Sequence, residues 1–362
     1  MLKGYAQRHT PSSPYYIMST KFVTFGEILL RFSKEDHCRL PQGRRFVGNY
    51  GGSEANVAVS LATLGEQVEF VTRLPDTPMG KAARMKLNEF NVGTQHIQYG
   101  GKRLGTYYFE EAAAMRNSLV IYDRANSSYY SLKPQMLNWE HILQDADVFH
   151  ASGITAAISQ DSADATFEAL DTADRMKKII SCDINYRKNL WKYGADPIET
   201  LGRMLQYSDI VFGDKIEYEF MTGRKVPFEA LDENYELDLD LYREWFDEIH
   251  AKWPRCQRWL MGIRNQVSSS QHTLTALLWT HGKMLSTRIY TIPNIVDPMG
   301  VGDAFMAAIL HAVNTNPDND QFSLEYSLAA AALKNSISGD FNLSTDEEIR
   351  GLMESRLEED IW

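Results

Sequence analysis

Two glycines and an aspartate stand at the start of an apolar segment near the end of the chain, in the run 296–304 (VDPMGVGDA). Glycines let the backbone turn sharply and bring its N–H groups close to a ligand. A helix that begins at such a turn adds unpaired N–H groups and the positive end of its dipole. We expect the amides of Gly300, Val301 and Gly302 to form an anion hole, and Asp303 to accept a proton from a hydroxyl beside it. These residue types predict phosphoryl transfer to an alcohol, although a Gly-x-Gly turn alone often serves only the geometry of the chain.

A second glycine pair opens another predicted helix, at 53–64. Gly51 and Gly52 would let the backbone approach a ligand closely, and the Asn56 amide could bind sugar hydroxyls. The alternative is a purely structural helix start, with Ser53 as the cap and an acidic residue after it. The sequence leaves both interpretations open.

Polar residues also follow the predicted buried strand 179–183. The carboxyl ends of parallel strands are where α/β proteins place their ligand contacts. Asp183, Asn185 and Arg187 stand there at alternate positions and are candidates for ligand binding. The alternative is a turn that its own polar side chains solvate.

Two carboxylates, Asp214 and Glu217, follow the next predicted strand, 210–213. A carboxylate here could hold Mg²⁺ through water molecules, as that ion prefers. The alternative is a capping box, with an aspartate at the start of a helix and a glutamate three residues later.

The elements that must position these residues alternate between strand and helix. Strands are predicted at 22–29, 68–71, 148–150, 179–183, 210–213, 259–263 and 274–279, and helices at 53–64, 79–90, 162–176, 197–205, 303–313 and 323–337. This order is typical of an α/β fold whose mostly parallel sheet is covered on both faces. At 101–130 two β-rich runs follow one another without a helix, and 31–50 has no helical period. We expect these two segments to form a small β lid over the site.

Composition narrows the classes of function. The chain has 362 residues, 44% hydrophobic and 23% charged, which is ordinary for a soluble globular protein. The net charge of −11 argues against a nucleic-acid partner and against an anionic membrane surface, and no apolar run has the length of a membrane span. Cys38, Cys182 and Cys256 form no zinc or disulfide pattern, so we expect free thiols in a reducing cytoplasm.

Two segments fall outside this pattern. Residues 1–20 lack the apolar centre of a signal peptide, and we expect a flexible extension before a main domain at 21–350. Residues 224–250 are rich in acidic side chains, and we interpret them as a solvated surface insertion that ends in a helix. A metal site is the alternative, but nothing arranges these acids around one point.

Together the motifs resemble those of the ribokinase-like (PfkB-type) carbohydrate kinases. The run 51–58 (GGSEANVA) is similar to the family's first signature, Gly-Gly-x-x-x-Asn-x-Ala, and the run 300–303 to its second, Gly-x-Gly-Asp. The resemblance extends from about residue 21 to about residue 342. It implies a three-layer α/β/α fold with ATP and Mg²⁺ as cofactors, and it leaves open a requirement for a monovalent cation.

Within the family the chain is most similar to the 2-keto-3-deoxygluconate kinases. This resemblance implies that Arg124 and Arg187 hold the acid substrate and that Tyr107 and Tyr122 line its pocket. The chemistry agrees, because a guanidinium presents a planar fork to a carboxylate. The alternatives are tyrosines that only pack on a sheet and a solvated arginine in a turn.

The resemblance also implies contacts to the nucleotide, and it places Glu217 near Mg²⁺ through water. The nucleotide contacts fall on Asn185, Asp214, Gly262, Arg264, Gly300, Gly302, Asn335 and Gly339.

The chain departs from the family pattern Asp-Thr-x-Gly-Ala-Gly-Asp, because Pro298, Met299 and Val301 stand in it. Loss of the threonine removes a hydroxyl near the phosphates, whereas Val301 keeps its backbone N–H. Asp214 replaces the asparagine of the family's Asn-x-x-Glu motif and adds a negative charge near ATP.

We therefore predict an ATP-dependent kinase that phosphorylates the primary hydroxyl of 2-keto-3-deoxygluconate to give 2-keto-3-deoxy-6-phosphogluconate. The alternatives are a kinase of fructose, ribose or a nucleoside in the same fold, and a non-catalytic sugar-binding homologue. A dinucleotide-dependent oxidoreductase is disfavoured because no Gly-x-Gly-x-x-Gly follows the first strand. A homodimer or larger assembly through the lid stays open.

Overall fold

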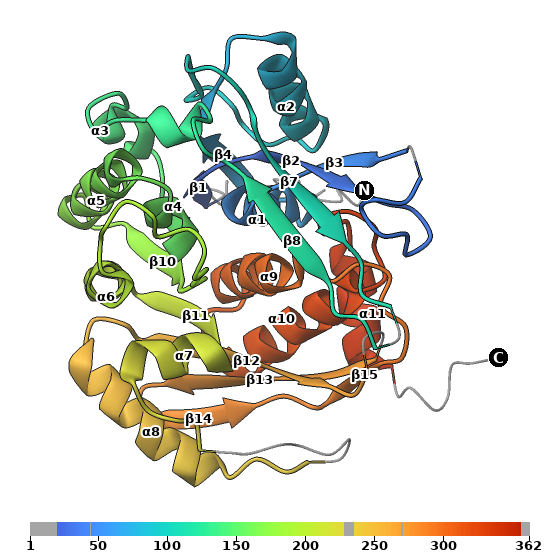
Figure 1. Ribbon diagram of the computed structural model, residues 1–362. Helices are drawn as coiled ribbons and strands as arrows, with labels where there is room; N and C mark the ends of the chain where they lie inside the picture. The colour runs from blue at the N-terminus through green and yellow to red at the C-terminus, as the bar shows by residue number, and fades with distance from the viewer. Residues whose placement is uncertain (1–19, 44, 114, 228–234, 269–270, 356–362) are drawn as a thin grey trace, which may run out of the picture.

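A nine-stranded sheet forms the centre of the computed structural model, which describes residues 20–355 except 44, 114, 228–234 and 269–270 (Figure 1). Six neighbouring strands are parallel: β4 (Gln67–Val71), β1 (Lys21–Phe25), β9 (Val148–Ser152), β10 (Ile179–Asp183), β11 (Ile210–Asp214) and β12 (Arg258–Gln266). The antiparallel strands β13 (His272–Thr280), β14 (Lys283–Ser286) and β15 (Tyr290–Ile292) complete the sheet. The carboxyl ends of β1, β9, β10 and β11 therefore share one edge.

Helices cover both faces of this sheet, and each face has its own hydrophobic core. One core contains residues of α3 (Trp139–Leu143), α4 (Gly153–Ala157), α5 (Gln160–Arg175), α6 (Pro197–Tyr207), α7 (Lys215–Thr222) and α8 (Leu239–Lys252). The other contains residues of α1 (Ser53–Thr63), α2 (Pro78–Glu89), α9 (Val301–Thr315), α10 (Asp320–Lys334) and α11 (Asp346–Glu354). The predicted three-layer α/β/α fold is confirmed.

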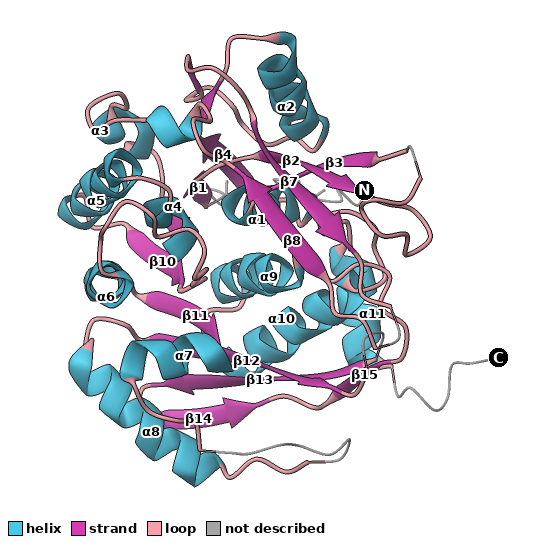
Figure 2. Ribbon diagram, in the orientation of Figure 1, coloured by secondary structure: helices cyan, strands magenta, loops and turns pink. Residues whose placement is uncertain are grey.

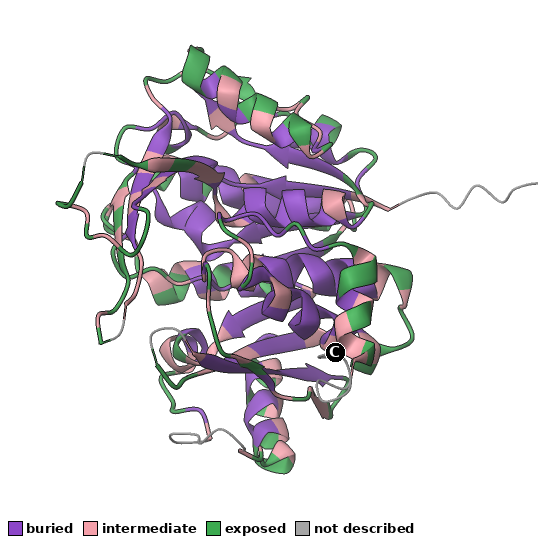
Figure 3. Cartoon of the chain, turned by 90° about the vertical axis from the view of Figure 1, so that its right-hand side faces the viewer, coloured by how far each residue is buried: buried purple, intermediate pink, exposed green. Residues whose placement is uncertain are grey.

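The central strands are buried on both faces, so their residues do not alternate between buried and exposed positions. All nine residues of β13 and four of the five residues of β1 are buried. A strand covered on both faces has no solvent side for polar residues. Figure 3 shows the buried residues in the strands and inner helix faces, with exposed residues on the outer surfaces.

A separate four-stranded sheet, here called the lid, stands beside the central sheet (Figure 2). It has the order β3 (Val47–Gly51), β2 (Leu29–Ser33), β7 (Gly105–Glu110) and β8 (Leu119–Asp123). Its inner face carries Leu29, Tyr107 and Phe109, which form a small core of their own. Two short strands, β5 (Arg73–Leu74) and β6 (Gln98–Tyr99), pair elsewhere, and a short 3₁₀ helix spans Tyr129–Ser131.

The predicted strand 22–29 is wrong as a single element, because β1 ends at Phe25 and the lid begins at Leu29. The chain changes sheets at Gly26, where an ideal Cβ would lie 1.9 Å from Oε2 of Glu54. Only a residue without a side chain fits there, and this close approach has no local signal in the sequence.

The second half of the acidic segment belongs to α8, a helix whose apolar side packs into a core. Trp245 and Phe246 of α8 are 5% and 0% exposed, whereas Glu244 and Glu248 face solvent. The acidic residues at 229, 232 and 233 lie outside the described residues, as does the predicted extension except for Thr20. In the part of the chain that the structure describes, no helix is both long and apolar enough to span a bilayer.

Candidate active site

A cavity of about 580 Å³ opens at the carboxyl edge of the parallel strands, between the central sheet and the lid. Asp183 and Asp214, the last residues of β10 and β11, line it. The inner face of the lid contributes Tyr107 and Tyr122, and the first turn of α9 contributes Asp303. The fold therefore brings together motifs that lie up to about 250 residues apart in the chain.

The predicted anion hole forms the wall of this cavity at the start of α9. Gly300 is the N-cap residue, with a φ of 81°, and the helix begins at Val301. The amides of a first helical turn have no partner within the helix, so those of Val301 and Gly302 are available to an anion. An ideal Cβ on Gly300 would lie 2.0 Å from the carbonyl oxygen of Asp340, so this packed, left-handed turn requires glycine.

The carboxylate of Asp303 is held from the start of α1. Ser53 Oγ donates to its Oδ1 at 2.8 Å, and Asn56 Nδ2 donates to its Oδ2 at 2.7 Å. Burial raises the pKa of Asp303, and the hydrogen bonds from Asn56 and Ser53 oppose this rise. The cap of α1 is Gly52, without a side-chain bond, so the structural interpretation of Ser53 is wrong. Ser53 is a site residue that sequence reasoning missed, although it stands inside the first motif.

Asp183 and Asn185 are 5% exposed each, so the alternative of a solvated turn is wrong for them. The Asn185 amide N–H donates to Asp183 Oδ1 at 3.1 Å, and its Nδ2 donates to Ser53 Oγ at 2.9 Å. Burial raises the pKa of Asp183 well above its usual range, and the charges of Glu217 and Asp303 add to this rise. This carboxyl therefore favours its protonated form while its neighbours are ionised.

The second carboxylate pair forms the capping box that the sequence offered as an alternative. The Glu217 amide donates to Asp214 Oδ1, and the Asp214 amide donates to Glu217 Oε2, both at 2.9 Å. The other oxygen of Glu217 lies 3.4 Å from Nη1 of Arg187. Burial and the nearby Asp214 raise the pKa of Glu217 to about 7, against the effect of Arg187. Both carboxylates still line the cavity.

Arg124 and Arg187 both line the cavity, but their surroundings differ. The Arg124 side chain is 6% exposed, and its Nε donates to Glu27 Oε2 at 2.7 Å, so it is not a solvated turn residue. The Arg187 side chain is 45% exposed. Its neighbour Tyr186 stacks on Phe220, with ring centroids 3.8 Å apart.

Tyr107 and Tyr122 face each other on neighbouring strands, with ring centroids 5.9 Å apart. The hydroxyl of Tyr107 donates to Asp340, a cavity residue that the sequence analysis gave no role. Burial raises the pKa of Asp340 to about 6, although Arg31 and Tyr107 lower it.

Strands β12 and β13 form the end of the cavity that lies away from the lid. Gly262 and Arg264 of β12 line it, together with Thr275 of β13. Phe212 approaches Gly262 closely, since an ideal Cβ there would lie 3.3 Å from its ring, and it stacks on Phe305 of α9 with centroids 4.9 Å apart. These residues lie away from the lid along the sheet.

Three predicted site residues do not line the cavity. Gly51 packs against Asp340, whose Oδ2 would lie 2.1 Å from an ideal Cβ. The Asn335 side chain donates to the carbonyl of Ala331 in its own helix. The Gly339 amide donates to Asp297 Oδ2 at 2.9 Å. In the structure these residues shape the loops beside the cavity, and their direct contact with a ligand stays a prediction.

Comparison with known proteins decides the family. The model of the pfkB family of carbohydrate kinases matches residues 19–248. The chain belongs to this family. It is an ATP-dependent sugar kinase, which confirms the predicted class of enzyme.

Several relatives of this pfkB-family kinase are named as kinases of sugar acids or related sugars. The crystal structure of 2-dehydro-3-deoxygluconokinase from Thermotoga maritima is 34% identical with a TM-score of 0.85, and covers 93% of this chain and 100% of that chain. The 2-dehydro-3-deoxygalactonokinase of Haloferax volcanii is 27% identical over 93% of this chain and 97% of its own length. A 5-dehydro-2-deoxygluconokinase of Clostridium botulinum is 25% identical over 86% of each chain.

The departures from the family pattern are accommodated by packing in this kinase. Met299 packs against the inner core of the lid, and Val301 packs against the core between α9 and the sheet. Pro298 lines the cavity. None of the three removes a backbone amide of the first turn of α9.

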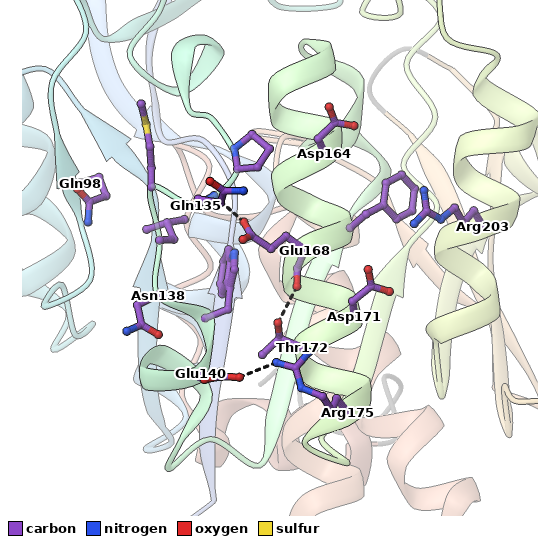
Figure 4. Close-up of a pocket in the computed structure, with 15 residues that line it drawn as sticks. Gln98, Gln135, Asn138, Glu140, Asp164, Glu168, Asp171, Thr172, Arg175 and Arg203 are labelled. Atoms are coloured by element: carbon purple, nitrogen blue, oxygen red, sulfur yellow. Dashed lines mark hydrogen bonds and ion pairs between the residues drawn. The ribbon is translucent and has the colours of Figure 1, made fainter.

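A second hollow of about 960 Å³ lies along α5, and it shares no lining residue with the cavity (Figure 4). Its polar side chains pair with one another, as Arg175 does with Glu140 at 2.8 Å. Glu168 likewise accepts from the Gln135 amide at 2.9 Å. This hollow is open to solvent and lacks the convergent base and amides of the cavity, so we assign it no role.

Proposed function

We propose that this kinase transfers the γ-phosphoryl group of ATP to the primary hydroxyl of 2-keto-3-deoxygluconate, which is also called 2-dehydro-3-deoxygluconate. The product is 2-keto-3-deoxy-6-phosphogluconate. The observation that carries the proposal is that Arg124 and Arg187 share one cavity with Asp303. A sugar acid needs both a cationic site for its carboxylate and a base at its far hydroxyl. The Thermotoga maritima enzyme of that name supports the choice.

The chemistry follows from the positions around Asp303. Asp303 accepts the proton of the attacking hydroxyl as its oxygen bonds to the γ-phosphorus, and the bond to the bridging oxygen of ADP breaks. The amides of Gly300, Val301 and Gly302 stabilise the charge on the transferring group. Ser53 and Asn56 orient the carboxylate, because each of its oxygens accepts one hydrogen bond.

The nucleotide takes the end of the cavity away from the lid, near Gly262, Arg264 and the start of α7. The donor set suits Mg²⁺, because Glu217 is a carboxylate and Asn185 Oδ1 is buried without a hydrogen-bond partner among the described residues. No cluster of three His, Cys, Asp or Glu side chains in that part of the chain could hold a metal ion by itself. The ion would therefore be held mainly by phosphates and water, with Glu217 and Asn185 around it, and would supply neutralising charge.

Replacement of Asp303 by Asn tests the base. We expect Asp303→Asn to lower kcat by about 10³-fold or more while sugar binding, measured by calorimetry, changes little. Asp318→Asn, an exposed carboxylate between α9 and α10, is the matched control and should keep its turnover. Near-normal turnover of Asp303→Asn would remove this residue from the mechanism.

Replacement of Arg187 tests recognition of the acid. Arg187→Ala should raise the KM for 2-keto-3-deoxygluconate by about 10- to 100-fold, since a charge-assisted bond contributes roughly 1.5–3 kcal/mol. The KM for a neutral sugar such as fructose should change little. Lys188→Ala removes a neighbouring exposed cation and serves as control. Equal losses for acidic and neutral sugars would contradict the proposal, and the galactonate epimer belongs in the same panel because of the Haloferax volcanii relative.

We further propose a cytoplasmic location and a homodimer. The free thiols Cys38, Cys182 and Cys256 suit a reducing compartment. The lid supports self-association, because its outer face exposes large apolar side chains such as Phe46 and Ile121, at 45% and 46%.

A further inference from the structure

Four buried charged residues lie against the anion-hole turn, and we call them the charge cluster; Asp340 among them also lines the cavity. Their exposed fractions are 1% for Arg31, 1% for Asp297, 0% for Lys334 and 3% for Asp340. Arg31 comes from the lid, where its Nη2 pairs with Asp297 at 2.5 Å and its Nη1 with Asp340 at 2.9 Å. Charges this deep in a protein persist only when they are compensated, and here two cations meet two carboxylates.

Lys334, the last residue of α10, reaches the back of the turn. Its Nζ donates to the carbonyl oxygen of Ile337 at 2.9 Å and to that of Asp297 at 3.4 Å. Its Cε would lie 3.5 Å from an ideal Cβ on Gly300. The stem of the lysine therefore passes immediately behind the turn, and its ammonium binds main-chain oxygens as a small cation would.

Asp297 connects this ammonium to the amides of the turn. Its Oδ1 accepts from the Met299 amide at 3.0 Å, and its Oδ2 accepts from the Gly339 amide at 2.9 Å. The carboxylate thus holds the turn against the loop that follows α10. Burial lowers the pKa of Lys334, whereas Asp297 and Asp340 favour its charged form.

The position of the Lys334 ammonium has a general physical reason. A turn that directs its amides toward a ligand leaves carbonyl oxygens on its other side, and when that side is dry these oxygens require a donor or a cation. A role as a helix cap would explain the bond from Lys334 to Ile337 at the end of α10. It would not explain the bond to Asp297 or the packing on Gly300, which belong to the turn.

We propose that Lys334 is the resident cation of the anion-hole turn, a positioning residue that replaces a bound monovalent cation. Phosphoryl transfer by this kinase therefore needs no added monovalent cation. A fixed positive charge behind the turn holds the amides in place before the reaction and favours the negative charge that develops in front of them. The inference rests on the proposed role of the turn and of Asp303, but not on which sugar is the substrate.

The first experiment uses the unaltered protein. Its kcat is measured with tetramethylammonium as the only monovalent cation, and again with K⁺, Na⁺ or NH₄⁺ at constant ionic strength. We expect a change of less than about twofold, and activation of about tenfold or more would overturn the proposal. Affinity for a non-hydrolysable ATP analogue with Mg²⁺ is titrated under the same conditions and should be equally insensitive to K⁺. This binding readout keeps the result distinct from a wrong choice of sugar, which abolishes turnover in every buffer.

The second experiment exchanges the lysine. Lys334→Ala should lower kcat by about 10²- to 10³-fold with little change in the KM for the sugar, and NH₄⁺, methylammonium or K⁺ should restore part of the loss. Lys334→Met keeps the stem without the charge and leaves no space for an added cation. Its kcat should therefore be low, and no added cation should restore it. Arg258→Ala, which breaks an ion pair with Asp320 at the other end of α10, is the control and should gain no cation dependence.

Thermal unfolding of each variant shows whether it folds, and the cation titration of the unaltered protein stands whatever that result. Normal turnover of Lys334→Ala would overturn the proposal. So would a loss of kcat in a folded Lys334→Ala protein that no cation restores, because shape rather than charge would then be what the lysine supplies.

Discussion

Asp303 meets two opposing requirements of a base in a closed site. Burial keeps water away from the reaction but raises the pKa of the carboxyl group, which disfavours its charged form. Two hydrogen bonds, from Asn56 and Ser53, stabilise the charged form and lower the pKa again. The start of α1 therefore helps to set the pH range in which Asp303 is ionised.

Replacement of Ser53 tests this relation. A donor to a carboxylate stabilises the ionised form, so its removal in Ser53→Ala should raise the pKa of Asp303. The acidic limb of the kcat/KM profile should therefore move to higher pH. Ser327→Ala removes a buried hydroxyl that donates to the Ser323 carbonyl within α10, and the profile of this variant should stay in place. An unmoved or downward-shifted limb in Ser53→Ala would contradict the assignment.

Single residues near the reacting groups could be predicted because their motifs are local. Asp303 stands beside the glycines of the turn, and Asn56 beside its own glycine pair. The bond from Ser53 to Asp303 joins residues 250 positions apart, and the ion pair of Arg31 with Asp297 joins residues 266 apart. No local pattern reports such contacts, because only the packing of the lid and of α1 against α9 creates them.

At the scale of elements, the start of α9 depends on one backbone conformation. Gly300 has a positive φ, and the carbonyl of Asp340 occupies the place that a side chain would need. Gly300→Ala should lower the free energy of unfolding by about 1–3 kcal/mol through backbone strain. It should also lower kcat by about tenfold or more, because the amides of the turn would move.

The matched control for this change is Gly351→Ala in α11, where an added Cβ would meet no atom within 4 Å. Alanine is the better helix former, so this variant should be as stable as the unaltered protein or up to about 1 kcal/mol more stable. Urea unfolding and steady-state kinetics check both variants. Similar behaviour of the two glycine variants would show that the turn tolerates a side chain.

Long periodic elements were predictable, and short ones governed by packing were not. Helix α1 and strand β4 appear within a residue or two of the predicted ranges, because their apolar residues follow one period. Helix α10 ends three residues before its prediction, at Lys334, where the chain turns back to the anion-hole loop. Helix α4 has only five residues, all buried, and too few turns to show a period.

At the scale of the whole molecule, the two faces of the lid sheet have different surroundings. Its inner face closes the cavity, and its strands send Arg31 and Tyr107 to the carboxylates behind the anion hole. Its outer face carries an aromatic group in which Phe32 stacks on Tyr108 with centroids 5.6 Å apart, and Phe46 lies 6.2 Å from the same ring. Exposed apolar clusters of this kind mark surfaces that another protein covers.

The occupant that we predict for this outer face is the lid of a second copy. Ile121 is 46% exposed there, opposite Tyr108 on the neighbouring strand, so Ile121→Asp would place a charge inside an apolar interface. Sedimentation should show a dimer for the unaltered protein and a monomer for this variant, with a dimer dissociation constant weaker by about 10- to 100-fold or more. Met85→Asp alters an exposed apolar residue of α2, which is 67% exposed and lies outside the lid, and should remain dimeric. A monomer before any substitution would contradict the dimer, and a dimer that survives Ile121→Asp would place the contact elsewhere. Because the lid also holds the anion-hole turn, dissociation should lower turnover as well.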